Sequence, residues 1–297
     1  MAVRRREVVA ATWCALGSPV MNEGQECGIA IVANDSVISW LLPFLESYRE
    51  TNSAIRLFVI PYDGNIASTR HAADVYGATW VESDLAEIDL LAERLYPFSP
   101  NRRRRLRKLQ ALALPLDKVI YLDVDTILFR DFRVLFSKID RGVTDFIVAS
   151  SSNEYVYNKK YLEFDYLNNV MLFSDGFFLT SRKILSVTDF CDVIGRDEKI
   201  FHAVRKRGGL YAQPLVNFVV HRQRLQVKSL AQCIPGASDE TFYKADGVTF
   251  GNTGPMDRFG REIYFAHWAG AIRTPRRRVF DQIWRDYSKR AAERVKL

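Results

Sequence analysis

The feature that most constrains this chain is a short apolar strand pattern that ends in two carboxylates. Residues 118–122 (KVIYL) are mostly the β-branched, aliphatic and aromatic side chains that fill buried strands. Asp123 and Asp125 follow, and because strand side chains alternate, the two acids point to the same side. Two like charges there carry a large desolvation cost, which a hard divalent cation would offset while leaving positions open for phosphate oxygens. The pattern therefore predicts a strand end that binds a cation.

The position of these acids carries more information than their spacing. An Asp-x-Asp sequence arises by chance about once in a chain of this length, and a solvated turn is the commoner explanation of a bare one. Here the pair follows one apolar run and precedes another, residues 127–129 (ILF). The pair is therefore expected at the carboxyl end of a core strand, which is the edge where open α/β sheets bind ligands.

Strand and helix patterns alternate through the first half of the chain. Asn34, Asp35 and Ser36 close the first strand pattern and offer an N-cap for the helix that follows. This order predicts an α/β fold with a doubly wound sheet and right-handed crossovers. We expect strands at 27–33, 55–60, 78–81, 118–122 and 145–150, and helices at 37–48, 68–76, 85–96, 106–114 (ended by Pro115) and 197–206.

The chain of 297 residues has no internal repeat, and we divide it into three parts. These are a lead-in (1–26), one α/β domain (27–272) and a basic C-terminal helix or tail (273–297). We expect no signal peptide, and no transmembrane helix because no run of 18 apolar residues occurs. The four scattered cysteines suit a reducing compartment, so we expect a cytoplasmic protein.

The net charge of +7 is concentrated in two clusters, which suggests acidic ligands such as a diphosphate or an anionic membrane surface. Solvated helix faces are an equally good explanation of both clusters. Nucleic acid is not expected, since no aromatic platform or binding module accompanies the charges. Aromatic residues within 280–287 allow either an amphipathic helix lying on a membrane or a packed terminal helix. The clusters are Arg102–Arg105 with Arg107 and Lys108, and Arg273, Arg276, Arg277, Arg278, Arg285, Lys289, Arg290, Arg294 and Lys296.

The central segment resembles the metal-binding region of nucleotide-sugar glycosyltransferases of the GT-A fold. The likeness is greatest to glycosyltransferase family eight, which contains galactosyltransferases, glycogenin and bacterial lipopolysaccharide enzymes. The basic helix residue and the "YLD-x-D" strand of that family match Lys108, Tyr121, Asp123 and Asp125. The opening "VANDSVISWLLPFLES" is also similar to the family. The resemblance implies a GT-A-like, Rossmann-like mixed sheet flanked by helices.

Three later segments resemble family motifs to different degrees. An "H-x-x-G" motif is matched by His267 and Gly270. A "D-Q-x-x-L-N" motif is matched by Gln213 and Asn217, but Ala212 replaces its acid. The "F-N-x-G" motif is altered, since Ser174 replaces the Asn and Asp175 precedes the Gly. The motif therefore does not identify which sugar the donor carries. The tyrosine-rich residues 154–169 suit either sugar stacking or local packing.

The resemblance implies roles for individual residues. Asp123, Asp125 and His267 would bind Mn²⁺ or Mg²⁺ together with the diphosphate of the donor. For some of these positions local structure explains the residue as well: Asn34 and Asp35 as turn and cap, and Gln213 as a helix start. The expected catalytic residues are Asp175 and Gln213, and the expected donor-binding residues are Asn34, Asp35, Asp63, Lys108, Asp123 and Asn217.

The expected activity is metal-dependent transfer of a hexose, with retention, from a nucleotide-sugar. A UDP-sugar is the favoured donor, and the acceptor would be a glycan, a lipid-linked glycan or a small molecule. The C-terminus offers peripheral contact with an anionic membrane. No dinucleotide fingerprint or P-loop occurs. Two alternatives remain: a haloacid-dehalogenase-type phosphatase with Asp123 as nucleophile, and a non-catalytic basic protein that binds anions or membranes.

Overall fold

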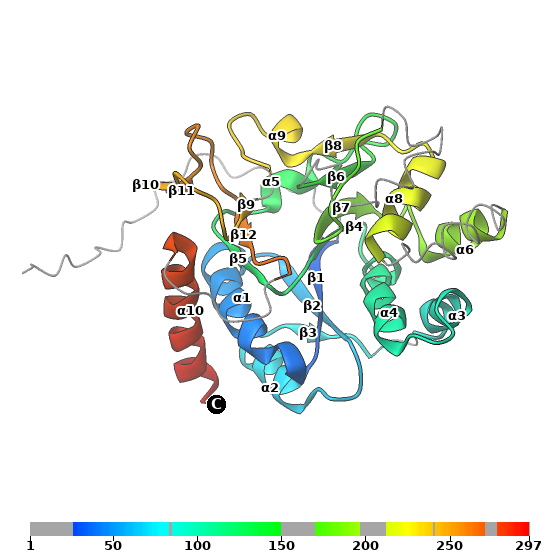
Figure 1. Ribbon diagram of the computed structural model, residues 1–297, viewed down its shortest axis with the longest axis horizontal. Coiled ribbons are helices and arrows are strands. Elements are labelled where there is room, and N and C mark those ends of the chain that lie inside the picture. Colours follow the sequence, from blue (N-terminus) through cyan, green and yellow to red (C-terminus); the bar gives the residue numbers. More distant parts are fainter. Residues whose placement is uncertain are drawn as a thin grey trace, which may run out of the picture.

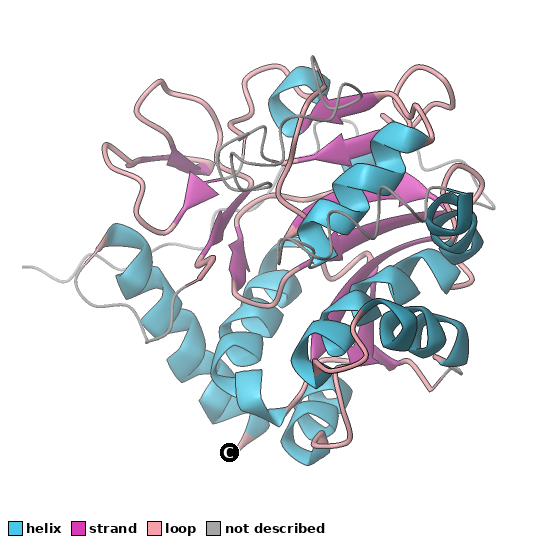
Figure 2. Ribbon diagram, turned by 45° about the vertical axis from the view of Figure 1, so that its right-hand side comes forward, coloured by secondary structure: helices cyan, strands magenta, loops and turns pink. Residues whose placement is uncertain are grey.

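A mixed seven-stranded sheet forms the centre of the protein (Figures 1 and 2). Its strand order is β3-β2-β1-β4-β7-β6-β8. The first four strands are parallel, β7 is antiparallel to both its neighbours, and β6 and β8 are parallel. The predicted doubly wound mixed sheet is confirmed. The strands are β1 (Cys27–Ala33), β2 (Arg56–Pro61), β3 (Thr79–Trp80), β4 (Lys118–Leu122), β6 (Phe146–Val148), β7 (Phe177–Ser181) and β8 (Val227–Ser229).

The computed structural model describes residues 26–82, 85–149, 170–196, 212–239, 241–270 and 278–296. Four features predicted from the sequence lie outside these ranges. They are most of the lead-in, the tyrosine-rich residues 154–169, the helix at 197–206, and the three arginines between positions 273 and 277.

Helices cover both faces of the sheet. Alternate side chains of β4 divide between the two cores: Val119 and Tyr121 face one helical layer, while Ile120 and Leu122 face the other. The first layer contains α3 (Ala86–Leu95), α6 (Val187–Arg196) and α8 (Ala212–Arg222). The second contains α1 (Ile38–Thr51) and α2 (Ala67–Val75). Figure 1 shows these layers on opposite sides of the strands.

The segment expected to be an α-helix at 106–114 is a 3₁₀-helix instead. A short helix, α4 (Pro100–Arg105), runs directly into η2 (Leu106–Ala113). All side chains from Lys108 to Leu112 are buried, so packing on several sides, and not one apolar stripe, determines the local geometry. Leu114 is extended, as residues before proline usually are, and this ends the helix.

A second, three-stranded sheet joins the first where β4 ends. Its order is β5 (Thr126–Leu128), β12 (Phe265–His267) and β9 (Thr241–Phe242). The antiparallel register of β12 on β5 places His267 opposite Thr126. Residues 123–125 therefore connect the two sheets, and a strand from the end of the chain lies beside them. A hairpin of β10 (Thr249–Gly251) and β11 (Gly254–Met256) precedes β12.

The basic C-terminal helix, α10 (Val279–Val295), packs against α1 (Figure 1). Phe280, Trp284 and Tyr287 are buried, and the Trp284 ring lies 5.6 Å from that of Trp40 on α1. The apolar side of this helix is therefore covered by protein, as in the packed-helix interpretation. In the described part of the chain, no helix is both long and apolar enough to cross a bilayer.

Short elements complete the connections between these layers. They are η1 (Asp35–Val37), α5 (Arg133–Phe136) and α9 (Leu230–Cys233).

Candidate active site

Three side chains that are metal ligands in many proteins converge where the two sheets meet. One ligand atom each of Asp123, Asp125 and His267 lies within 4.8 Å of the others. His267 Nε2 is 3.1 Å from Asp125 Oδ1, although the residues are 142 positions apart. The antiparallel pairing of β12 with β5 produces this proximity. The structure thus brings together the three residues that the sequence suggested as metal ligands.

Backbone hydrogen bonds fix both acids in place. The amide of Asp123 donates to the carbonyl of Gly176 (2.8 Å), and the amide of Trp268 donates to the carbonyl of Asp125 (2.8 Å). The first bond attaches the link to β7 and the second to β12. The main chain of both acids is therefore bonded to two other segments, so the geometry of the group depends on the fold and not on a free loop.

Gly176 leaves the space that the cluster occupies. A methyl group at this position would lie 2.6 Å from His267 Cε1 and 3.1 Å from Asp123 Oδ2. The first distance is far below van der Waals contact, so a larger residue would displace the imidazole. The Gly of the altered "F-N-x-G" motif is thus needed for close approach between β7 and the histidine.

A buried lysine balances part of the negative charge beside the cluster. Lys108 Nζ lies 2.9 Å from Asp175 Oδ2 and 3.5 Å from Asp123 Oδ1. Burial alone would lower the pKa of Lys108, but Asp123 and Asp175 outweigh it and hold that pKa above its usual value. Lys108 is therefore charged, and Asp175, suggested as a sugar contact, is a buried member of this ion pair.

The charges of the group fit a divalent cation. Asp123, Asp125 and Asp175 contribute three negative charges and Lys108 one positive charge, which leaves an excess of about two when His267 is neutral. Burial alone would raise the pKa of Asp125, but a protonated His267 beside it outweighs burial and lowers that pKa. A bound cation would take the place of that proton, because a histidine that binds a metal is neutral. Two carboxylates and one imidazole are a mixed oxygen and nitrogen donor set, which suits Mn²⁺.

The residues expected to hold the donor's nucleoside lie at the carboxyl ends of β1 and β2. Asn34 Nδ2 donates to Asp63 Oδ2 (3.0 Å), and Arg104 of α4 lies 3.3 Å from the same oxygen. Asp35 instead accepts hydrogen bonds from the amide and hydroxyl of Thr69 (2.8 and 2.9 Å) at the start of α2. Asp35 therefore caps the start of α2. The sequence pattern suggests it instead as a cap for the helix that directly follows β1, but α1 begins after Val37 with no side-chain cap hydrogen bond.

Gln213 and Asn217 occupy the first two turns of α8 and differ in exposure. Gln213 is partly exposed, whereas Asn217 is fully buried. The Asn217 amide accepts from the Phe173 amide (3.0 Å) and donates to the Phe173 carbonyl (2.8 Å). Its polar atoms are thus bonded to backbone, and the side chain anchors the segment that leads to Gly176; a contact of Asn217 with the donor stays a prediction.

Two contacts of the cluster were not anticipated. The Tyr121 hydroxyl donates to Asp123 Oδ1 (2.7 Å), and the ring of Phe242 stacks on the His267 imidazole with centroids 6.2 Å apart. Burial, and then Asp123, raises the pKa of Tyr121 well above its ordinary value, so the hydroxyl stays a donor. Tyr121 was visible in the strand motif. Phe242 carried no signal, because the pairing of β9 with β12 joins distant segments.

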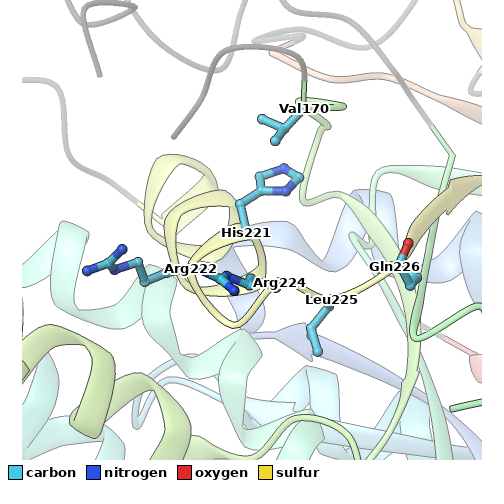
Figure 3. A pocket seen from close by; sticks show the side chains of 6 residues that line it. All are labelled: Val170, His221, Arg222, Arg224, Leu225 and Gln226. Carbon is cyan, nitrogen blue, oxygen red and sulfur yellow. The ribbon is translucent and has the colours of Figure 1, made fainter. Parts of the chain in front are cut away.

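A separate pocket of about 370 Å³ lies at the C-terminal end of α8 (Figure 3). It shares no residue with the cluster. His221, one of its walls, bonds through Nε2 to the Met171 carbonyl (2.9 Å), and burial lowers the pKa of His221. The histidine thus has a structural partner, and the pocket contains no predicted site residue.

Comparison with known proteins gives matches in structure and not in sequence. No family model and no curated protein matches the chain. The galactosyltransferase LgtC, solved in complex with donor and acceptor sugar analogs, superimposes with a TM-score of 0.57 at 15% identity. The match covers 89% of this chain and 95% of LgtC.

Two further glycosyltransferases give similar results. GlyE of Streptococcus pneumoniae TIGR4 matches over 92% of this chain (TM-score 0.53, 12% identity), and the bifunctional glycosyltransferase WbbM over 93% (TM-score 0.59, 12% identity). This chain spans 62% of the GlyE structure and 52% of the WbbM structure. The GT-A-like fold implied by the family resemblance is therefore confirmed over most of the chain.

Proposed function

We propose that this protein is a metal-dependent glycosyltransferase that transfers a hexose from a nucleotide-sugar. The proposed donor is a UDP-sugar, the proposed acceptor a glycan, a lipid-linked glycan or a small molecule, and the proposed stereochemical outcome retention. The observation that supports this most directly is the convergence of Asp123, Asp125 and His267 at the sheet edge of a glycosyltransferase fold.

The residues around the cluster suit the departure of a diphosphate. A Mn²⁺ or Mg²⁺ ion held by Asp123, Asp125 and His267 would supply positive charge to the leaving diphosphate. Lys108 adds a fixed charge on the same side, since it lies within 3.5 Å of Asp123. Two carboxylates one residue apart on a single link act as ligands, in contrast to the separated acid and base of a glycosidase.

Asp175 and Gln213 are the proposed contacts to the donor sugar. Gln213 is partly exposed in the first turn of α8. Asp175 is buried in its ion pair with Lys108, so it would orient the sugar by holding Lys108 or by exchanging that partner for a hydroxyl. Asn34, Asp63 and Arg104 form the proposed nucleoside end of the site.

The two rival functions are less well supported. A phosphatase nucleophile at Asp123 requires no histidine from the end of the chain, yet His267 adjoins the pair. A non-catalytic anion-binding protein requires neither the buried Lys108–Asp175 pair nor the close approach at Gly176. No observation favours either over transfer.

The test is hydrolysis of a panel of nucleotide-sugars with and without Mn²⁺, measured as release of nucleoside diphosphate. Parent protein, Asp125→Asn and Asp117→Asn are compared. Asp117 is the matched control, because it lies next to the opposite end of β4. Its carboxylate accepts from the Glu26 amide (3.3 Å) and approaches Arg182 and Lys183, at 3.6 and 3.9 Å.

The expected result is UDP release that requires Mn²⁺, falls at least about 100-fold in Asp125→Asn and is retained in Asp117→Asn. Hydrolysis of phosphomonoesters without turnover of any nucleotide-sugar would support the phosphatase instead. Ligand binding that persists without any turnover and without Asp125 would support the binding protein.

A further inference from the structure

The two oxygens of the Asp123 carboxylate have different surroundings. Oδ1 accepts the Tyr121 hydroxyl at 2.7 Å and lies 3.5 Å from Lys108 Nζ. Oδ2 lies on the other side, 3.1 Å from the position of a methyl group on Gly176, which would itself be 2.6 Å from His267. One oxygen is therefore occupied by donors, and the other lies toward the histidine.

The Tyr121 ring is held rigidly enough to determine this asymmetry. Tyr121 is 2% exposed, and its ring stacks on Phe178 of β7 with centroids 5.1 Å apart. The Lys108 ammonium lies 4.9 Å from the centroid of the Tyr121 ring. Because β4 and β7 are neighbouring strands, the hydroxyl is fixed by the core of the sheet and not by a loop.

We propose that Tyr121 is a positioning residue that presents Asp123 to the cation through Oδ2 alone. The proposal rests on the proposed function, because it assumes that the cluster binds a divalent cation. Without the hydroxyl, Oδ1 keeps only the longer contact with Lys108 (3.5 Å), so the carboxylate rotates more easily and binding has to order it first. Groups that orient a ligand in this way typically change metal affinity by about 10- to 100-fold.

The proposal is tested by titrating the purified protein with MnCl₂ alone, using calorimetry. Tyr121→Phe removes the hydroxyl and keeps the stacked ring, and we expect its Kd for Mn²⁺ to rise at least about tenfold. Tyr48→Phe is the matched control: this tyrosine is also buried, and its hydroxyl donates to the Ile55 carbonyl in another part of the protein. Its Kd for Mn²⁺ should equal that of the parent.

A second variant covers the case in which Tyr121→Phe fails to fold. Phe178→Leu keeps the hydroxyl but loosens the ring that orients it, so its Mn²⁺ affinity should fall by less than in Tyr121→Phe. Thermal unfolding without metal checks that each variant is folded.

The outcomes separate this inference from the proposed function. If the parent binds Mn²⁺ and both site variants bind it equally well, the positioning role is wrong and the metal site stands. An equal loss in Tyr48→Phe would also overturn it, because the effect would then be general. If the parent itself binds no Mn²⁺, the proposed function fails with it.

Discussion

His267 Nε2 lies 3.1 Å from Asp125 Oδ1, and this contact joins the last strand of the fold to the link that leaves the central sheet. The contact requires three features at once: the register of β12 on β5, the amide of Trp268 on the Asp125 carbonyl, and the absence of a side chain at Gly176.

Binding of a divalent cation should stabilise the folded protein. Mn²⁺ at 100 times its Kd should add about 2.7 kcal/mol to the free energy of unfolding, measured by thermal or urea unfolding. Mg²⁺ should act only at higher concentration, because the imidazole of His267 favours the softer ion. Asp125→Asn should abolish the effect, and an unchanged Mn²⁺ response in that variant would contradict the site.

Gly176→Ala should damage the cluster selectively. The new methyl group would lie 2.6 Å from His267 Cε1, so the imidazole has to move and the Mn²⁺ affinity should fall at least about tenfold. Gly195→Ala is the control, because no atom lies within 4 Å of its added methyl and it occupies a helix, α6. It should leave Mn²⁺ binding unchanged and stabilise the protein by up to about 1 kcal/mol. Calorimetric titration measures both variants.

Asn217→Ala should destabilise the protein more than it affects donor chemistry. It leaves the amide and carbonyl of Phe173 without their side-chain partners, at a cost of about 3 kcal/mol in the free energy of unfolding. The exposed Asn65→Ala should change stability by less than about 0.5 kcal/mol. Urea unfolding measures both. A large rise in the KM for the donor, in a variant as stable as the parent, would instead indicate that Asn217 contacts the donor directly.

The ionisation of Glu46 should make the free energy of unfolding depend on pH. This buried carboxylate on α1 bonds to Arg49, Tyr76 and Arg294, which outweigh its burial and lower its pKa from 4.5 to about 2. Because the folded-state pKa is depressed, the stabilisation is fully present above pH 4.5 and is lost as the pH falls toward 2.

Glu46→Gln tests this dependence. At pH 7 the variant should be less stable by about 2 kcal/mol, because it loses charged hydrogen bonds between α1, α2 and α10. The difference from the parent should shrink as the pH falls from about 4.5 toward 2, when urea unfolding is repeated across that range. Glu93→Gln, at an exposed ion pair, should cost less than about 1 kcal/mol. A Glu46→Gln difference that is constant with pH would refute the assignment.

Local sequence patterns were sufficient to predict the structure of segments whose conformation depends mainly on their own side chains. The run from Lys118 to Leu122 is a core strand because its side chains are apolar on both faces. Asp123 and Asp125 lie at its carboxyl end, as the alternation of strand and helix patterns predicted. The 3₁₀ geometry of residues 106–113 was missed, because burial on several sides replaced the one-sided pattern on which the prediction depended.

Contacts between distant segments could not be predicted from such local patterns. Nothing in the sequence shows that Asn217 pairs with the Phe173 backbone, that Phe242 stacks on His267, or that Asp175 is buried against Lys108. Each contact depends on which surfaces of separate elements meet, and a residue's type does not specify that.

The sequence by itself determined most strands of the central sheet, the placement of two acids at a strand end and the chemical character of the ligands. Only the tertiary structure decided that one oxygen of Asp123 is occupied by Tyr121 while the other lies toward His267. The physical reason is range: the side-chain alternation of a strand acts over a few residues, whereas a binding geometry accurate to tenths of an ångström requires packing across the whole core.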